Sequence, residues 1–157
     1  MIQFQSERFF FAMNVLDYQY PDTTPLRFNW DANWLSVEIT IGKEGKRFTF
    51  TDPCLLTREL PYLKEFLEQM RLETNVVTDS LGFIEPVLEF KYHYLGGNQF
   101  WLNVTVGVFH PIPGWPFKET KLNGLNLTFI IDTETAGKAS EMIDLWIKKY
   151  PFRNIEE

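Results

Sequence analysis

Cysteine and histidine, the residues on which many catalytic and metal sites depend, are scarce in this sequence. Its 157 residues include one cysteine, Cys54, and two histidines, His93 and His110. A single cysteine excludes a disulfide framework within the chain and fits a reducing compartment. Neither histidine belongs to a zinc-ligand spacing or to a metalloprotease motif. The sequence therefore predicts no catalytic residue, no metal ligand and no cofactor.

Long hydrophobic runs and a secretion signal are also missing. No apolar run approaches the roughly 18 residues that cross a bilayer. The N-terminus lacks a basic region followed by an apolar stretch and a small-residue cleavage site. We therefore expect a cytoplasmic protein without a membrane partner.

Basic residues are fewer than acidic ones, and the excess of acid is concentrated in one stretch. The net charge is −6, which argues against a nucleic-acid partner because phosphate contacts need a clustered basic surface. Residues 59–89 hold seven acids against two bases, whereas the segments on either side are nearly neutral. Such a stretch attracts a basic partner, or it is simply a solvated helix face that keeps the protein soluble.

Alternating apolar residues predict strands along most of the chain. The expected strands are 9–18, 33–41, 47–51, 87–94, 100–109 and 125–131. Glycine-containing turns at 42–45 and 96–98 join two pairs of them as hairpins. Strands with one apolar and one polar face are typical of antiparallel sheets. We therefore predict a single α+β domain over residues 1–157, in which two main helices pack on an antiparallel sheet of about six strands in two layers.

The first predicted helix follows the second hairpin strand. Asp52 and Pro53 fit the N-cap and the first helical position, and the next residues carry an apolar stripe at helical spacing. Pro61 is expected to divide this region into a short turn and a main helix over 61–71. Cys54 would then lie at a helix N-terminus, where the helix dipole lowers the pKa of a thiol. Because acidic and apolar neighbours oppose that shift, we expect a packed, unreactive cysteine.

The second predicted helix begins at Asp132 or Thr133 and is stopped by Pro151. Its apolar residues share one face. Its outer face carries two ion pairs at the favourable spacing of four residues, Glu134–Lys138 and Asp144–Lys148.

A proline-rich loop at 110–117 carries two aromatic residues, Trp115 and Phe117. A stiff loop with an exposed aromatic side chain is a good interface anchor, because little entropy is lost on binding. Alternatively, Trp115 folds back to cover the end of the sheet. The sequence favours neither interpretation.

Two segments share a pattern with a known family. The first runs from a strand at 34–37 through a glycine hairpin into residues 48–59, Phe-Thr-Phe-Thr-Asp-Pro-Cys-Leu-Leu-Thr-Arg-Glu. The second is residues 84–90, Ile-Glu-Pro-Val-Leu-Glu-Phe. In these segments, over about the first 95 residues, the chain resembles the WapI-type immunity proteins of bacteria, and the C-terminal part is similar mainly in its closing helix. The shared residues are those expected to be structural, with Asp52 as a helix cap.

The resemblance implies a protein that binds and blocks the toxic C-terminal domain of a polymorphic toxin, often a nuclease, without catalysing a reaction. Nuclease domains are usually basic, so an acidic surface suits the substrate cleft of such a partner. Together with the aromatic loop, this predicts six partner-binding residues: Glu65, Glu68, Glu73, Asp79, Glu85 and Trp115.

Two other functions are open on the residues alone. One is a small-ligand-binding or enzymatic domain whose site lies on the uncovered face of the sheet, near Trp34 and Trp101. The other is a structural subunit that uses an exposed sheet edge in a larger assembly. A deep hollow with buried polar groups favours a ligand, whereas a flat acidic or aromatic surface favours a protein partner.

Overall fold

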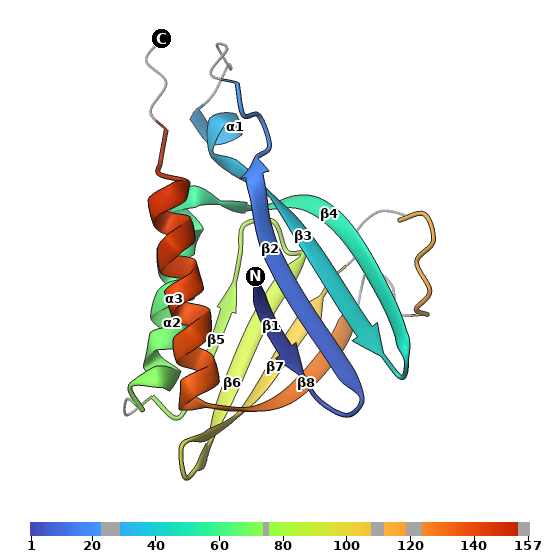
Figure 1. Cartoon of the computed structure of the whole chain (residues 1–157), viewed down its shortest axis with the longest axis vertical. Coiled ribbons are helices and arrows are strands. Elements are labelled where there is room, and N and C mark those ends of the chain that lie inside the picture. Colours follow the sequence, from blue (N-terminus) through green and yellow to red (C-terminus); the bar gives the residue numbers. More distant parts are fainter. Residues whose placement is uncertain (23–28, 74–75, 108–111, 119–123, 154–157) are drawn as a thin grey trace.

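Eight strands form two antiparallel sheets in the computed structural model, which describes residues 1–22, 29–73, 76–107, 112–118 and 124–153 (Figure 1). Each sheet has its four strands in sequence order. The N-terminal sheet consists of β1 (Ile2–Gln5), β2 (Phe9–Tyr18), β3 (Trp34–Lys43) and β4 (Lys46–Leu56). The C-terminal sheet consists of β5 (Thr78–Gly82), β6 (Leu88–Gly96), β7 (Gln99–Val106) and β8 (Leu125–Asp132).

The α+β class is confirmed, but the prediction of one sheet with about six strands is wrong. All six predicted strands are present, although the end of the strand expected at 100–109 falls partly outside the described residues. The two strands that were not predicted, β1 and β5, are only four and five residues long. Both predicted hairpins are confirmed, and their turns contain the positive φ angles that such turns need, at Glu44, Gly45, Gly97 and Asn98.

The segment around Cys54 continues a strand and does not begin a helix. Asp52 pairs with Val37 and Leu55 pairs with Leu35 in the ladder between β4 and β3. The prediction that Asp52 caps a helix is therefore wrong, because pairing with β3 outweighs the local preference of Asp-Pro for a helix start. The packed cysteine is confirmed: Cys54 is 1% exposed, and its burial raises the pKa of its thiol.

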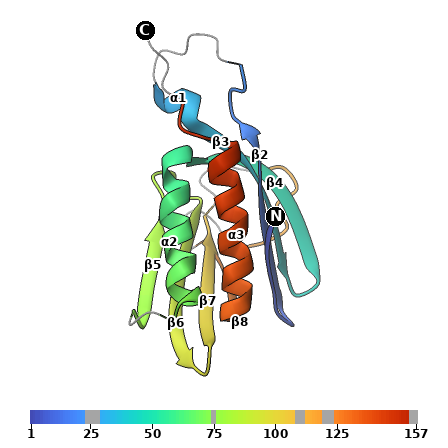
Figure 2. The same cartoon turned by 60° about the vertical axis from the view of Figure 1, so that its left-hand side comes forward.

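The first main helix starts after a short 3-10 helix, η1 (Thr57–Glu59), and is α2 (Leu60–Arg71). Pro61 lies in its first turn, as predicted. The second, α3 (Thr133–Lys149), lies beside α2, and Figure 2 shows the two helices together in front of the C-terminal sheet. A third helix, α1 (Asn29–Asn33), precedes β3. Within the described ranges, no helix is long and apolar enough to cross a membrane.

Both ion pairs that the sequence predicts on α3 are present. Glu134 and Lys138 are 3.3 Å apart, and Asp144 and Lys148 are 2.9 Å apart. Asp144 also accepts a 2.9 Å hydrogen bond from Lys64, which ties α3 to α2.

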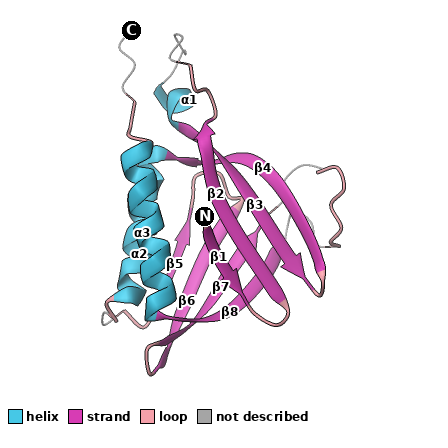
Figure 3. Ribbon diagram, in the orientation of Figure 1, coloured by secondary structure: helices cyan, strands magenta, loops and turns pink. Residues whose placement is uncertain are grey.

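The inner face of the C-terminal sheet is covered partly by the N-terminal sheet and partly by the helices (Figure 3). Phe11 of β2 and Phe90 of β6 join the two sheets at a ring-centroid distance of 6.0 Å. Phe66 of α2 reaches Tyr92 of β6 at 5.1 Å. One cluster of buried side chains therefore runs through both sheets and both long helices.

Arg153 anchors the segment that follows α3. Its guanidinium donates hydrogen bonds to the carbonyl oxygens of Ala32 and Tyr20 and lies 3.7 Å from the ring centroid of Tyr18. The amide of Asn33 donates to the Arg153 carbonyl oxygen at 2.8 Å. These contacts fix the end of the described chain against α1 and β2.

Asp132 caps α3, and we predict that its removal costs stability in a pH-dependent way. Its carboxylate accepts the backbone N–H of Thr135 at 2.8 Å. Hydrogen bonds from the backbone and the side chain of Thr135 lower the pKa of Asp132. Replacing an N-cap Asp with Ala costs about 1 kcal/mol. We expect Asp132→Ala to lower the free energy of unfolding by that amount in denaturant titrations at pH 7.

The sign of the pH dependence follows from the lowered pKa. The charged cap stabilises the fold fully above the unfolded-state pKa of about 3.9, and the effect is lost as the pH falls through the folded-state pKa. The difference between the wild type and Asp132→Ala should therefore shrink under acid. Asp132→Asn is the control, because it keeps the acceptor and does not titrate. An equal loss at neutral and acid pH contradicts this account.

Candidate functional site

The helix α2 and the edge strand β5 lie side by side and run in opposite directions. Near the start of α2, Glu59 accepts the backbone N–H of Ile84, just past the end of β5. Near the end of α2, Gln69 accepts the hydroxyl of Tyr92, which faces the start of β5. We call the exposed surface formed by residues 60–73 and 76–86 the α2–β5 surface.

Glu59 fixes one end of this surface from inside the protein, where the start of α2 meets the end of β5. One carboxylate oxygen accepts the N–H of Leu56 at 2.9 Å, and the other accepts the N–H of Ile84 at 2.8 Å. The residue is only 6% exposed. Glu59 therefore contributes to the acidic excess of residues 59–89 in the sequence but not to an acidic surface.

Four of the five predicted acidic residues are placed along the α2–β5 surface without an ion pair to any described residue. Glu65 and Glu85 are exposed, and Glu73 is exposed in the turn after α2. Asp79 is partly buried in β5 and accepts the N–H of Ser80 at 2.9 Å. Burial, together with the negative charge of Asp79, raises the pKa of Tyr92 to about 12.

Glu68, the fifth predicted acid, is engaged in contacts within the protein. It pairs with Arg71 at 2.8 Å and accepts a hydrogen bond from the hydroxyl of Ser140 on α3. The hydrogen bond from Arg71, followed by that from Ser140, lowers the pKa of Glu68 despite some burial. Its carboxylate thus joins the two helices, and its charge is largely balanced.

A hollow of about 470 Å³ lies where the start of α2 meets the end of β5. Two apolar side chains stand at it, Tyr62 at 60% exposure and Ile84 at 54%. The signal for both residues in the sequence is weak: Tyr62 lies off the apolar stripe of its helix, and Ile84 precedes a Glu-Pro turn. The lining residues are Arg58, Glu59, Tyr62, Leu81, Gly82, Phe83 and Ile84.

A second hollow, of about 390 Å³, lies between α2 and α3 and is dominated by paired charges. Hydrogen bonds from Lys64 and Lys148 lower the pKa of Asp144 to about 2. Of its six lining residues, only Leu145 is apolar. In the hollow beside Tyr62, four of the seven lining residues are apolar or aromatic.

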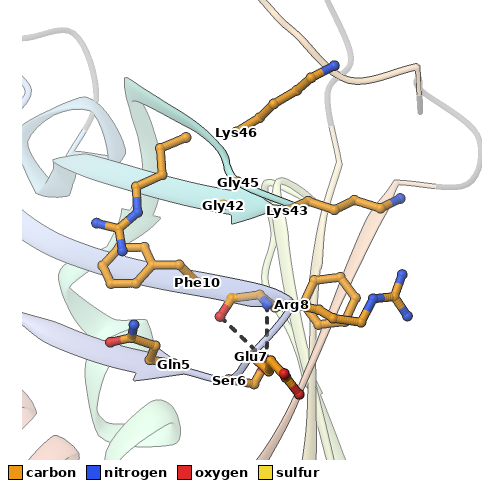
Figure 4. Close-up of a pocket in the computed structure, with 11 residues that line it drawn as sticks. Gln5, Ser6, Glu7, Arg8, Phe10, Gly42, Lys43, Gly45 and Lys46 are labelled. Carbon is orange, nitrogen blue, oxygen red and sulfur yellow. Dashed lines mark hydrogen bonds between the residues drawn. The ribbon is translucent and has the colours of Figure 1, made fainter.

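A third hollow, of about 350 Å³, lies at the β1–β2 and β3–β4 turns and is lined by four basic residues, Arg8, Lys43, Lys46 and Arg47 (Figure 4). Arg8 pairs with Glu44 at 2.7 Å, and the guanidinium of Arg47 lies 3.8 Å from the ring centroid of Phe10. Figure 4 shows Lys43 and Arg8 extending to the same side and Lys46 extending upward, apart from both. The basic groups therefore do not converge on one point, as a compact anion site requires.

Trp115, the sixth predicted residue, packs against the N-terminal sheet. Its ring meets Phe48 edge-on at 5.5 Å and Phe117 at 5.3 Å, and it is partly buried. The ring therefore covers part of that sheet, and its role in partner binding stays a prediction. His110 and Pro111 of the same loop lie outside the described residues.

The residues proposed for a small-ligand site lie in different sheets. Trp34 begins β3, whereas Trp101 lies in β7 opposite His93 of β6. Neither lines any of these three hollows. In the part of the chain that the structure describes, no three His, Cys, Asp or Glu residues are grouped in a way that could hold a metal ion.

One family model matches the chain, and it covers residues 1–151. Its description is the immunity protein WapI-like family. No curated protein and no solved structure matches the chain. The match confirms the resemblance seen in the sequence and extends it through β7 and β8 to α3.

Because Glu59 accepts two backbone hydrogen bonds, we predict that replacing one of its carboxylate oxygens with an amide NH₂ lowers the stability of the fold. Gln at this position has one acceptor oxygen in place of two, so one buried backbone N–H loses its partner. An unpaired buried polar group costs about 1–3 kcal/mol. We expect Glu59→Gln to lower the free energy of unfolding by that amount in urea titrations. Glu65→Gln, on the exposed face nearby, should change it by less than about 0.5 kcal/mol; equal effects contradict the role of Glu59.

Proposed function

The chain belongs to the WapI-like immunity protein family, and we propose that it binds the toxic C-terminal domain of a cognate toxin and blocks it. The binding site in this proposal is the α2–β5 surface. The observation that carries it is the hollow beside Tyr62, where Tyr62 and Ile84 are exposed. Exposed carboxylates follow both of them in the sequence, Glu65 about one turn after Tyr62 on α2 and Glu85 directly after Ile84. Neighbouring apolar and acidic groups of this kind suit a protein partner with a basic surface.

Exposed carboxylates supply the electrostatic part of this proposal. Glu65, Glu73 and Glu85 make no ion pair with any described residue, so their charges act on the solvent and on whatever binds there. A nuclease binds the phosphate backbone through basic residues. A surface with exposed carboxylates competes for those residues and speeds association with the toxin. This supports a basic nuclease domain as the partner.

Tyr62 and Ile84 supply the apolar part. Interface hot spots are enriched in aromatic side chains that enter the partner and exclude water. Both residues sit on elements that Glu59 fixes, so little conformational entropy is lost when a partner covers them. Binding without turnover also agrees with the structural use of Cys54 and Glu59, which are both buried.

Protection of cells tests the proposed function directly. The C-terminal domain of the protein encoded by the gene immediately upstream is tested as the toxin, by expressing it in a host with and without this chain. We expect the domain alone to stop growth and the chain to restore it, with the two proteins copurifying in a 1:1 complex. Growth that stays arrested, despite folded chain in excess, overturns the proposal.

Charge reversal tests the acidic part of the α2–β5 surface. Glu65→Lys and Glu85→Lys each replace an attraction with a repulsion, and we expect each to weaken toxin binding roughly tenfold at low ionic strength. The loss should diminish in salt, because added ions screen exposed charges. Titration calorimetry at two salt concentrations measures both effects.

Glu7→Lys is the matched control. Glu7 is also exposed and undergoes the same change of charge, but it lies in the turn between β1 and β2, far from α2 in Figure 1. Binding by this variant should stay within about twofold of the wild type. Equal weakening by all three variants would show that only the net charge matters.

A further inference from the structure

The strand β5 forms one edge of the C-terminal sheet. It pairs with β6 on one side, and no described strand pairs with it on the other. Figure 2 shows β5 at the outer margin of the sheet, beside α2. Thr78, Ser80 and Gly82 are all exposed, and a Cβ atom added at Gly82 would meet no other atom within 4 Å. The edge is therefore open to solvent.

The ladder register identifies the backbone groups that this edge offers. The N–H of Tyr94 donates to the carbonyl oxygen of Val77 at 2.8 Å, and the pairing continues from Thr78 with His93 to Gly82 with Glu89. In an antiparallel pair, only alternate residues exchange hydrogen bonds. The backbone groups of residues 77, 79 and 81 therefore point toward β6. Those of Thr78, Ser80 and Gly82 point toward the free edge.

The Ser80 N–H, the middle donor of this edge, has an acceptor within β5 itself. The N–H of Ser80 is bonded to the carboxylate of Asp79, its own neighbour in sequence. This agrees with the register, since a donor that faced β6 would bond to that strand. Short edge strands and charged side chains commonly protect a sheet edge from pairing with other chains. An incoming strand has only to displace this one local hydrogen bond.

The opposite end strand of the N-terminal sheet is protected in a different way. There β4 carries Pro53, which has no N–H to offer to a further strand. The remaining end strands, β1 and β8, approach each other. Among the described end strands, β5 therefore differs from β4, β1 and β8 in having an unpaired edge without a proline.

The surroundings of β5 indicate the chemistry of its occupant. Residues 76–91 carry three acids, Asp79, Glu85 and Glu89, and one base, Lys91. The hollow beside Tyr62 lies at the end of β5 and is lined there by Leu81, Phe83 and Ile84. A strand that aligned with β5 would meet Asp79 on β5 itself, Glu89 opposite Gly82 on the neighbouring β6, and an apolar hollow at one end.

We infer that β5 pairs with an extended basic segment of the toxin domain, which adds a fifth strand to the C-terminal sheet. This rests on the proposed function and states how the partner is held. Main-chain hydrogen bonds to Thr78, Ser80 and Gly82 supply affinity, and an apolar side chain in the hollow beside Tyr62 supplies specificity. Acidic residues around β5 favour a basic segment over an acidic one.

Ser80→Pro removes one outward N–H and leaves the ladder between β5 and β6 intact, because the Ser80 N–H does not face β6. Proline is tolerated on an edge strand for this reason. With the purified toxin domain from the protection test as the probe, we expect Ser80→Pro to raise the dissociation constant roughly tenfold or more. Ser80→Ala keeps the N–H and should bind within about twofold of the wild type. Unchanged unfolding midpoints for both variants confirm their folds.

Amide hydrogen exchange on the unaltered chain provides a measurement that needs no folded variant. The amides of Thr78, Ser80 and Gly82 should exchange quickly in the free chain and slowly in the complex. Those of Asp79 and Leu81, which face β6, should be protected in both. Slowed exchange at the three outward amides, together with weak binding by Ser80→Pro, supports the inference.

The outcomes separate this inference from the proposed function. If the wild-type chain binds the toxin domain while the outward amides stay unprotected, strand pairing is wrong and the proposed function stands. If Ser80→Pro folds and binds like the wild type, strand pairing is also wrong. If the wild-type chain does not bind the toxin domain at all, both fail.

Discussion

The buried carboxylate of Glu59 accepts hydrogen bonds from two backbone N–H groups that lie far apart in the chain, those of Leu56 and Ile84. Leu56 ends β4, and Ile84 follows β5, so one side chain joins both sheets at the start of α2. The Leu56 donor is buried and the Ile84 donor is partly buried, and an N–H group without an acceptor in such a place is costly. The position of α2 against β5, and with it the α2–β5 surface, therefore depends on this residue.

Glutamates in this protein take three different roles, which only the fold separates. Glu59 is buried and structural, Glu68 joins α2 to α3 through Arg71 and Ser140, and Glu65 is exposed. In the sequence all three belong to one acidic stretch. Under the proposed function, the exposed carboxylates that remain on the α2–β5 surface attract a basic toxin domain.

Elements with strong local signals could be predicted from the sequence. The strand 9–18 matches β2, and the helix that begins after Asp132 matches α3 with its cap. The strand β5 has only one large apolar residue, Leu81, because an edge strand beside a helix buries little. At residues 52–54 the local pattern suits both a helix start and an edge strand, and pairing with β3 decides between them. The acidic part of the candidate site followed from composition, whereas the hollow beside Tyr62 depends on a contact between α2 and β5 that periodicity does not encode.

Photo-cross-linking tests the central claim, that a toxin domain binds at the α2–β5 surface. A photoreactive amino acid replaces Tyr62 in one variant and Thr49 in another. Both positions are exposed, but Thr49 lies on the outer face of the N-terminal sheet. We expect light to join the toxin domain to the chain at position 62 and not at position 49. Cross-linking at position 49, with none at position 62, would contradict the account.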